Sequence, residues 1–280
     1  MPNSVNKTID DVAESIIDDT NKYSDKVVRD MDDVRKEVND ILMRYSDDEG
    51  FIPKHKMKQV LRELDSLETE FSDTLTESLE SQVVKSSKAL NKAVIGGIAA
   101  SIGLSIAFGS LTNVPSEKDF SEDMLKYLKG NKIDNLTIYD RIIRLAGMFR
   151  DDIQKSIRYG ILSGFTFNKI SLEVKKVIDK GMYQVKNIIN TEIPNVVRKG
   201  LVTIGGKMKV LKAVKIIDNR GRHPYHYHHM CYKYAEQNKY GMGKGVFKPS
   251  DTYILNPHPQ CTAYFQYIFD EKKLRSGENA

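Results

Sequence analysis

Residues 9–45 read IDDVAESIIDDTNKYSDKVVRDMDDVRKEVNDILMRY, and this stretch sets the helical character of the chain. Apolar side chains recur along it at steps of three, four and seven residues: Ile9, Val12, Ile16, Tyr23, Val27, Met31, Val34, Val38, Ile41 and Tyr45. Such spacing gives a helix one apolar face, as in a coiled coil. The stretch therefore predicts a long helix that packs on a partner helix or on the rest of the chain.

A second apolar stripe follows a break at residues 47–50, Asp-Asp-Glu-Gly. Pro53 stands where a helix can begin, because its missing N–H costs nothing in a first turn. The stripe consists of Met57, Val60, Leu61, Leu64, Leu67, Phe71, Leu75, Leu79 and Val83. Together the two stripes predict an antiparallel helical hairpin over residues 6–87. They do not distinguish packing within one chain from a seam between copies.

The middle of the chain predicts four more helices. They are a short helix capped by Ser121 and ended by Gly130-Asn131, a helix over 137–162, a helix over 169–180, and a helix over 183–200 that Pro194 kinks or divides. The helix over 137–162 carries one regular apolar face, made of Ile138, Ile142, Leu145, Phe149, Ile153 and Ile157. Proline in a helix interior removes a hydrogen bond, which is why a break is expected at Pro194.

The last third of the chain changes to strand-like sequence. β-Branched and aromatic residues with partial alternation occupy 207–217, 252–255 and 263–269, which predicts a small sheet. Residues 271–280 are expected to form a frayed tail. The fold class is therefore α+β and mostly α-helical, with a helical hairpin and an apolar helix followed by a helical core with a small C-terminal sheet. The expected domains are an acidic arm (1–92), an apolar helix with connector (93–136) and a basic core (137–280).

Residues 93–111, AVIGGIAASIGLSIAFGSL, contain no charged side chain. That length is enough to span a bilayer. Gly97 with Ser101, and Gly103 with Ala107, have the small-xxx-small spacing that lets helices approach closely. A helix buried among its neighbours explains the same residues, so burial and transient membrane contact both stay open.

Charge is distributed unevenly along the chain. Residues 1–80 carry 21 acidic against 11 basic side chains, and residues 81–280 carry 32 basic against 17 acidic. Basic surfaces often bind nucleic acid, whereas an acidic segment can also pair with a basic one in the same chain. With two cysteines and no secretory leader at its start, the chain is expected to be made in a reducing cytoplasm.

Five of the six histidines and both cysteines lie between residues 218 and 261. His228 with Cys231, and His258 with Cys261, form two His-x-x-Cys pairs, and two such pairs can make a tetrahedral zinc site. His226 or His229 can replace His228 in this arrangement. The alternative is a reduced pair of core cysteines beside surface histidines.

The sequence contains little that indicates an enzyme. Glu192, Asp218 and the histidines are of a type that a metal-dependent nuclease uses, but no motif orders a nucleophile, a base and an orienting group. The chain also lacks the HExxH, GxSxG, GxGxxG and Walker patterns. We therefore expect a protein that is not an enzyme and has no catalytic residues.

The order of short motifs over about residues 140–270 resembles the Mu F-like head morphogenesis family of phage minor head proteins. The motifs are the turn GFTFNKI (164–170), Asn190-Thr191-Glu192, Asp218-Asn219-Arg220, the loop from His226 to Cys231, Phe247, and His258-Pro259-Gln260-Cys261. Asn190 stands where the family usually has arginine. Thr262-Ala263 replaces the Arg-Cys that usually ends the last motif.

The resemblance implies a virion component inside the phage head, present in the host cytoplasm during assembly. Its implied partners are the portal protein and packaged double-stranded DNA, with scaffold or capsid proteins as further candidates. The residues expected to contact DNA are Lys207, Lys209, Lys212, Lys215, Arg220 and Arg222. Glu192, Asp218 and His258 are expected to form a polar network in the core. The rival hypotheses are a membrane-active delivery protein acting through 93–111 and a metal-dependent nuclease.

Overall fold

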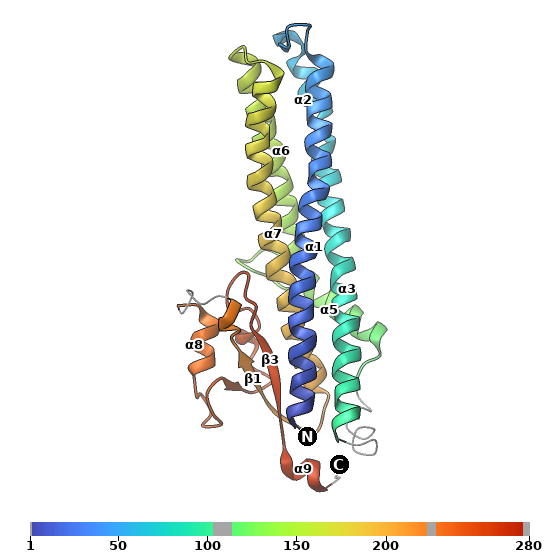
Figure 1. Ribbon diagram of the computed structural model, residues 1–280, viewed down its shortest axis with the longest axis vertical. Helices are drawn as coiled ribbons and strands as arrows, with labels where there is room; N and C mark the ends of the chain where they lie inside the picture. Colours follow the sequence, from blue (N-terminus) through green and yellow to red (C-terminus); the bar gives the residue numbers. More distant parts are fainter. Residues whose placement is uncertain (1, 103–113, 223–227, 277–280) are drawn as a thin grey trace. The chain divides into compact units, whose positions relative to one another are not determined.

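The computed structural model describes residues 2–102, 114–222 and 228–276, and it confirms a mostly helical α+β fold with a small antiparallel sheet (Figure 1). The helices are α1 (Pro2–Tyr45), α2 (Met57–Glu63), α3 (Ser66–Ile102), α5 (Glu117–Gly130), α6 (Ile138–Leu162), α7 (Phe167–Gly206), α8 (Met230–Glu236) and α9 (Glu271–Ser276). The strands are β1 (Leu211–Ile217), β2 (Val246–Phe247) and β3 (Tyr264–Phe269). Short 3-10 turns cover Lys54–Lys56, Arg220–Arg222 and Thr252–Ile254.

The chain forms two compact units, each built from separate stretches of sequence. Unit 1 takes Met1–Asn21, Glu80–Gly130 and Ile189–Ala280, and unit 2 takes Lys22–Leu79 and Asn131–Ile188. Helices α1, α3 and α7 each contribute to both units. The units therefore follow different boundaries from the ranges 1–92, 93–136 and 137–280, whose role as domains stays a prediction.

The predicted helical hairpin is present, with α1 and α3 running antiparallel. Its second stripe is buried from Val60 to Val83, apart from Leu61, which is half-buried. The Asp47 carboxylate closes the hairpin by accepting hydrogen bonds from the backbone N–H groups of Phe51 (2.8 Å) and Glu49 (3.2 Å). The second helix is divided into α2 and α3 by a turn at Leu64-Asp65, a break that the continuous apolar stripe did not indicate.

Helix α5 begins at Glu117, four residues before the predicted cap Ser121. Ser116 caps it, since its hydroxyl accepts a hydrogen bond from the Asp119 N–H at 3.2 Å and donates one to the Asp119 carboxylate at 2.8 Å. Ser121 instead lies inside the helix, where its hydroxyl donates to the Glu117 carbonyl. Both serines precede acidic residues, so local sequence alone did not separate the two positions.

Helix α6 confirms the prediction for 137–162, and its N-terminus carries a full capping box between Thr137 and Asp140. The two helices predicted after it form one helix, α7, which continues through Gly181 and Pro194. The physical reason is burial: all residues from Thr191 to Arg198 are buried, and packing on both sides of Pro194 outweighs the lost hydrogen bond.

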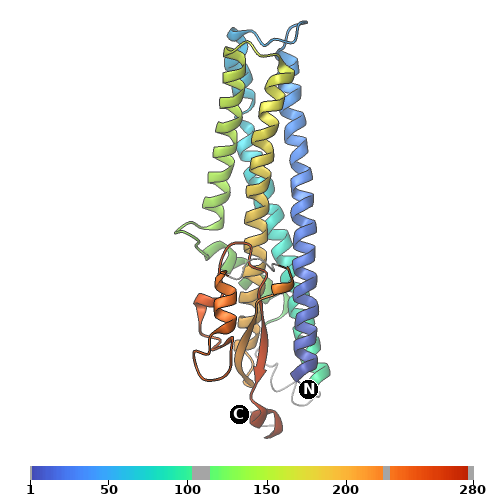
Figure 2. The same cartoon turned by 60° about the vertical axis from the view of Figure 1, so that its left-hand side comes forward.

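The three strands form one antiparallel sheet in the order β2-β1-β3, with Val214 opposite Tyr267. Both views place β1 and β3 beside the C-terminal part of α7 (Figure 1, Figure 2). The Tyr267 hydroxyl there donates a hydrogen bond to the Leu201 carbonyl at 2.6 Å. The side-chain amide of Asn6 in α1 bonds both the N–H (2.8 Å) and the C=O (3.0 Å) of Tyr267, so α1 covers the open edge of β3.

Two predictions for the C-terminal third were wrong. The predicted strand at 252–255 is instead the 3-10 turn Thr252–Ile254, because Asp251 accepts hydrogen bonds from the Lys248 N–H and the Tyr240 hydroxyl and folds the chain back. Residues 271–276 form α9, whose first turn is capped by the Asp270 carboxylate, which accepts a hydrogen bond from the Lys272 N–H at 3.0 Å. Residues 277–280 of the predicted tail lie outside the described residues.

The close approach of α6 and α7 in unit 2 depends on a glycine. A Cβ atom at Gly181 would lie 2.7 Å from Cδ2 of Phe149, which stacks on Phe71 at 5.4 Å between ring centroids. We expect Gly181→Ala to lower the free energy of unfolding by about 1–3 kcal/mol, because the aromatic pair must shift. Urea denaturation measures the change. Gly206→Ala is the control, since a Cβ there meets no described atom within 4 Å; equal losses in both variants would contradict the prediction.

Candidate metal centre beside a buried arginine

The centre of unit 1 is organised by Arg198, which projects from α7 and is 0% exposed. Its guanidinium donates hydrogen bonds to three main-chain carbonyls, those of Leu255 (2.5 Å), Cys261 (2.9 Å) and Ala263 (2.6 Å), and to the side chain of Asn195. A guanidinium presents its donors in a rigid plane, so it can hold several acceptors at fixed positions. Arg198 thereby fixes the chain from residue 255 to residue 263 against α7.

A second contact places the His258-Pro259-Gln260-Cys261 turn within this stretch. The Gln260 N–H donates a hydrogen bond to the hydroxyl of Thr191, one helical turn from Asn195, at 3.0 Å. Gln260 adopts a φ of 55°, a left-handed conformation that non-glycine residues rarely take. The Thr191 hydroxyl helps to hold this turn, which points His258 and Cys261 toward α8.

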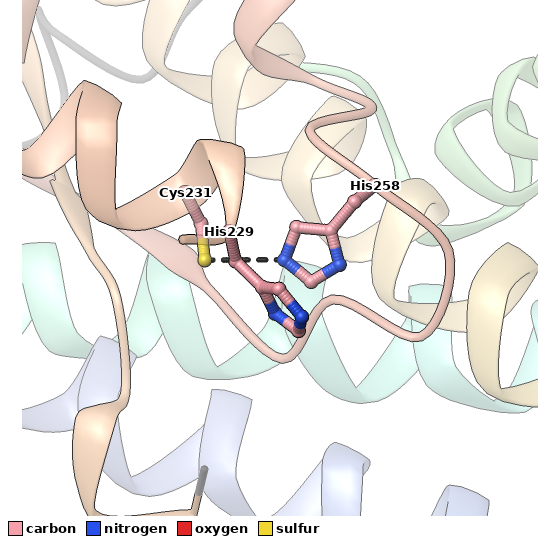
Figure 3. Close-up of side chains that lie close together, drawn as sticks. All are labelled: His229, Cys231 and His258. Carbon is pink, nitrogen blue, oxygen red and sulfur yellow. Dashed lines mark hydrogen bonds between the residues drawn. The ribbon is translucent and has the colours of Figure 1, made fainter. Parts of the chain in front are cut away.

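Helix α8 supplies the other half of the cluster. His229 is its N-terminal cap residue and Cys231 lies in its first turn, so both face the 258–261 turn (Figure 3). The Cys231 Sγ lies 3.2 Å from Nε2 of His258, and the rings of His229 and His258 are 4.1 Å apart between centroids. One potential ligand atom from each of His229, Cys231 and His258 lies within 4.8 Å of the other two.

Cys261 borders this group and is 0% exposed. Hydrogen bonds link its sulfur to Cys231 and to His258. The Cys231 thiol, the Arg198 guanidinium and His258 hold the pKa of Cys261 well below its usual range, although burial opposes them. The same Cys231–Cys261 hydrogen bond, together with burial, raises the pKa of Cys231. The two thiols are therefore unequal, since the pKa of Cys261 is lowered and that of Cys231 is raised.

His258 is oriented by its other ring nitrogen. Nδ1 lies 2.8 Å from the Pro259 carbonyl oxygen. Burial lowers the pKa of His258, but its interactions with Cys261 and with this carbonyl together raise the pKa by more, so the net direction is upward. A carbonyl oxygen can only accept a hydrogen bond, so Nδ1 carries a proton and Nε2 is the atom that points to Cys231.

Of the four predicted metal ligands, Cys231 and His258 belong to this group, and Cys261 borders it. His229 rather than the predicted His228 completes the group, because the cap of α8 turns His229 toward His258 while His228 is exposed. Among the described residues the group contains no carboxylate. Histidine and cysteine ligands suit zinc, whereas magnesium and calcium prefer oxygen.

The predicted polar network is spread over separate contacts. Glu192 is buried on α7, one turn before Asn195. Asp218 follows β1 and accepts a hydrogen bond from Nε of Arg220 at 2.7 Å. His258 lies 3.2 Å from the Cys231 sulfur through its Nε2 atom. The sequence analysis did not single out Arg198. The one indication that this arginine is buried was its apolar surroundings in the sequence, Val196, Val197 and Leu201, which are all buried.

The six residues predicted to contact DNA divide into two groups. Lys207, Lys209, Lys212 and Lys215 are exposed around the start of β1. Arg220 instead forms ion pairs with Asp218 and Glu236, and Arg222 forms ion pairs with Glu14 and Asp18 of α1. Part of the acidic charge of the N-terminal segment is therefore paired with basic residues of the same chain. The uneven charge distribution had left this pairing open as an alternative to DNA binding.

Pairing of β1 with β3 adds two lysines that sequence reasoning missed. Leu211 lies opposite Phe269, so α9 begins beside the start of β1. Lys272 and Lys273 are exposed there, and the Lys273 ammonium donates a hydrogen bond to the Lys209 carbonyl at 3.1 Å. We call Lys207, Lys209, Lys212, Lys272 and Lys273 the lysine patch.

Helix α3 contains residues 93–102 of the apolar segment, and residues 103–111 lie outside the described part of the chain. Within the described residues, no helix has an apolar stretch of the length needed to cross a bilayer. Compared with known proteins, the sequence matches no family model, no curated protein and no solved structure. The family resemblance therefore rests on the motifs themselves.

The role of Arg198 can be tested by a substitution that keeps its charge. Lysine cannot reproduce three carbonyl bonds in one plane, so Arg198→Lys leaves buried acceptors without donors. We expect a loss of about 3–5 kcal/mol in the free energy of unfolding, measured by urea denaturation. Arg158→Lys, at an exposed position on α6, is the control and should change stability by less than about 0.5 kcal/mol. Similar values for the two variants would contradict this assignment.

Proposed function

We propose that this chain is a non-catalytic minor head protein of a phage, located inside the head and associated with the portal protein and packaged double-stranded DNA. The observation that carries the proposal is the convergence of the motifs behind the family resemblance. Thr191, Cys231, His258 and Cys261 come from three separate motifs, and all of them lie in one cluster beside Arg198. Motifs that matched by chance would have no reason to meet in space.

The DNA half of the proposal is supported by the lysine patch. Its five ammonium groups are exposed and come from the α7–β1 connection, β1 and α9. Lysines bind duplex DNA by neutralising phosphates and releasing condensed counterions, which needs positive charge on a shared surface and no base-specific geometry. The patch meets this requirement better than Arg220 and Arg222, whose charges are balanced by carboxylates of the same chain.

The protein-partner half is supported by apolar side chains on the surface of unit 2. On α6, Met148, Tyr159 and Leu162 are between 46% and 63% exposed, and their spacing of eleven and three residues places them on one helical face. On α7, Leu172 and Tyr183 are 61% and 64% exposed at the same eleven-residue spacing. Grouped exposed apolar residues are typical of protein contact surfaces. We assign the portal contact to these exposed stripes of α6 and α7.

The experiment that tests the proposal is duplex-DNA binding by the full chain over a salt series in the presence of magnesium. We expect binding that weakens steeply with salt and leaves the DNA intact. Replacing Lys207, Lys209 and Lys212 by glutamine should reduce the slope of log K against log salt by about 3, since each lysine contributes about 0.9. Fluorescence anisotropy measures binding, and electrophoresis of the recovered DNA measures cleavage.

The matched control neutralises three exposed lysines of unit 2, Lys54, Lys58 and Lys175, and should leave the slope nearly unchanged. Absence of binding at low salt would contradict the DNA role. Cleavage that requires a divalent metal and is lost in His258→Ala would instead support a nuclease.

A further inference from the structure

We propose that the chain binds one Zn²⁺ ion, with His229, Cys231, His258 and Cys261 as its four ligands. This inference does not depend on the proposed function, because it follows from the geometry of the cluster alone. It assigns a ligand set that differs from the His-x-x-Cys pairs of the sequence, since His229 takes the place of His228.

The spacing of the donor atoms fits a tetrahedral zinc ion. With Zn–N near 2.0–2.1 Å and Zn–S near 2.3 Å, neighbouring ligand atoms of a tetrahedron lie about 3.3–3.8 Å apart. Cys231 Sγ and His258 Nε2 are already 3.2 Å apart. All three donor atoms of His229, Cys231 and His258 lie within 4.8 Å of one another, so small side-chain rotations suffice to complete the geometry.

Cys261 is the fourth ligand because it contacts two of the other three. The Cys261 side chain is hydrogen-bonded to Cys231 and to His258, so its sulfur lies close to both of these ligands. Zinc binds cysteine as the thiolate, so metal binding would release the thiol protons.

The orientation of His258 is an independent observation that points to a metal. Metal-bound histidines commonly donate their other N–H to a backbone carbonyl or a carboxylate, which fixes the ring. His258 makes this bond through Nδ1 to the Pro259 carbonyl, at 2.8 Å, and so directs Nε2 at the cluster. Pro259, lacking an N–H, contributes only its carbonyl to the turn.

Four protein ligands would fill the coordination sphere and leave no position for a substrate, as in structural zinc sites. Cys231 and Cys261 are buried, whereas His229 and His258 are half-buried. The ion would tie α8 to the 258–261 turn, and through the Arg198 bonds to α7. We therefore assign it a structural role that fastens the short helix α8, which has only two turns, to the core of unit 1.

The test is metal content and thermal stability of the full chain, purified under reducing conditions with zinc present. We expect one zinc per chain by elemental mass spectrometry, and cobalt substitution should give the visible absorption of a tetrahedral thiolate site. A chelator should lower the melting temperature. Less than about a tenth of a zinc per chain, or cobalt spectra of an octahedral oxygen site, would overturn the proposal.

Two neighbouring variants separate metal loss from unfolding. Asparagine is a good N-cap residue, so His229→Asn preserves the start of α8 while removing a ligand. It should lose zinc and become insensitive to the chelator, with circular dichroism unchanged at low temperature. His228→Asn should keep a full equivalent of zinc. The reverse pattern would overturn the ligand assignment, and a Cys231–Cys261 disulfide under reducing purification would overturn the site itself.

Discussion

The buried guanidinium of Arg198 is the interaction on which the rest of unit 1 depends. Burying a cation without partners costs several kcal/mol, and Arg198 offsets that cost with hydrogen bonds to three backbone carbonyls and to Asn195. The same bonds determine the path of residues 255–263, which have no regular secondary structure beyond a single turn. The positions of His258 and Cys261, and the entry of the chain into β3, follow from that path.

We assign three different roles to three separate parts of the chain. The interior of unit 1 holds the histidine and cysteine cluster, and we assign it a structural ion. The lysine patch, built where β1 and β3 meet α9, is the surface that we assign to DNA. Exposed apolar side chains of α6 and α7 in unit 2 are the surface that we assign to a protein partner. A head protein that contacts both the portal and the genome needs two such surfaces of different chemistry.

The periodicity of apolar residues predicted those helices whose burial involves a single apolar face. The stripes of α1 and α3 and the start of α6 follow from apolar spacing and capping chemistry, and the structure confirms them. The continuity of α7 through Gly181 and Pro194 was not predictable, because tertiary burial decides it. Arg198 escaped notice since a single arginine in a helix usually lies at the surface. The choice of His229 over His228 depends on which residue caps α8, and adjacent positions there point in different directions.

The most direct measurement of the central claim is hydrogen exchange of the Arg198 Nε–H group by nuclear magnetic resonance in the unmodified chain. Nε donates to the Leu255 carbonyl in an interior that excludes water. We predict a resolved resonance whose exchange at neutral pH is slower by orders of magnitude than that of Arg44, whose side chain is 62% exposed. Exchange as fast as that of Arg44 would mean that the guanidinium is open to solvent, and it would contradict a buried Arg198 that holds residues 255–263 against α7.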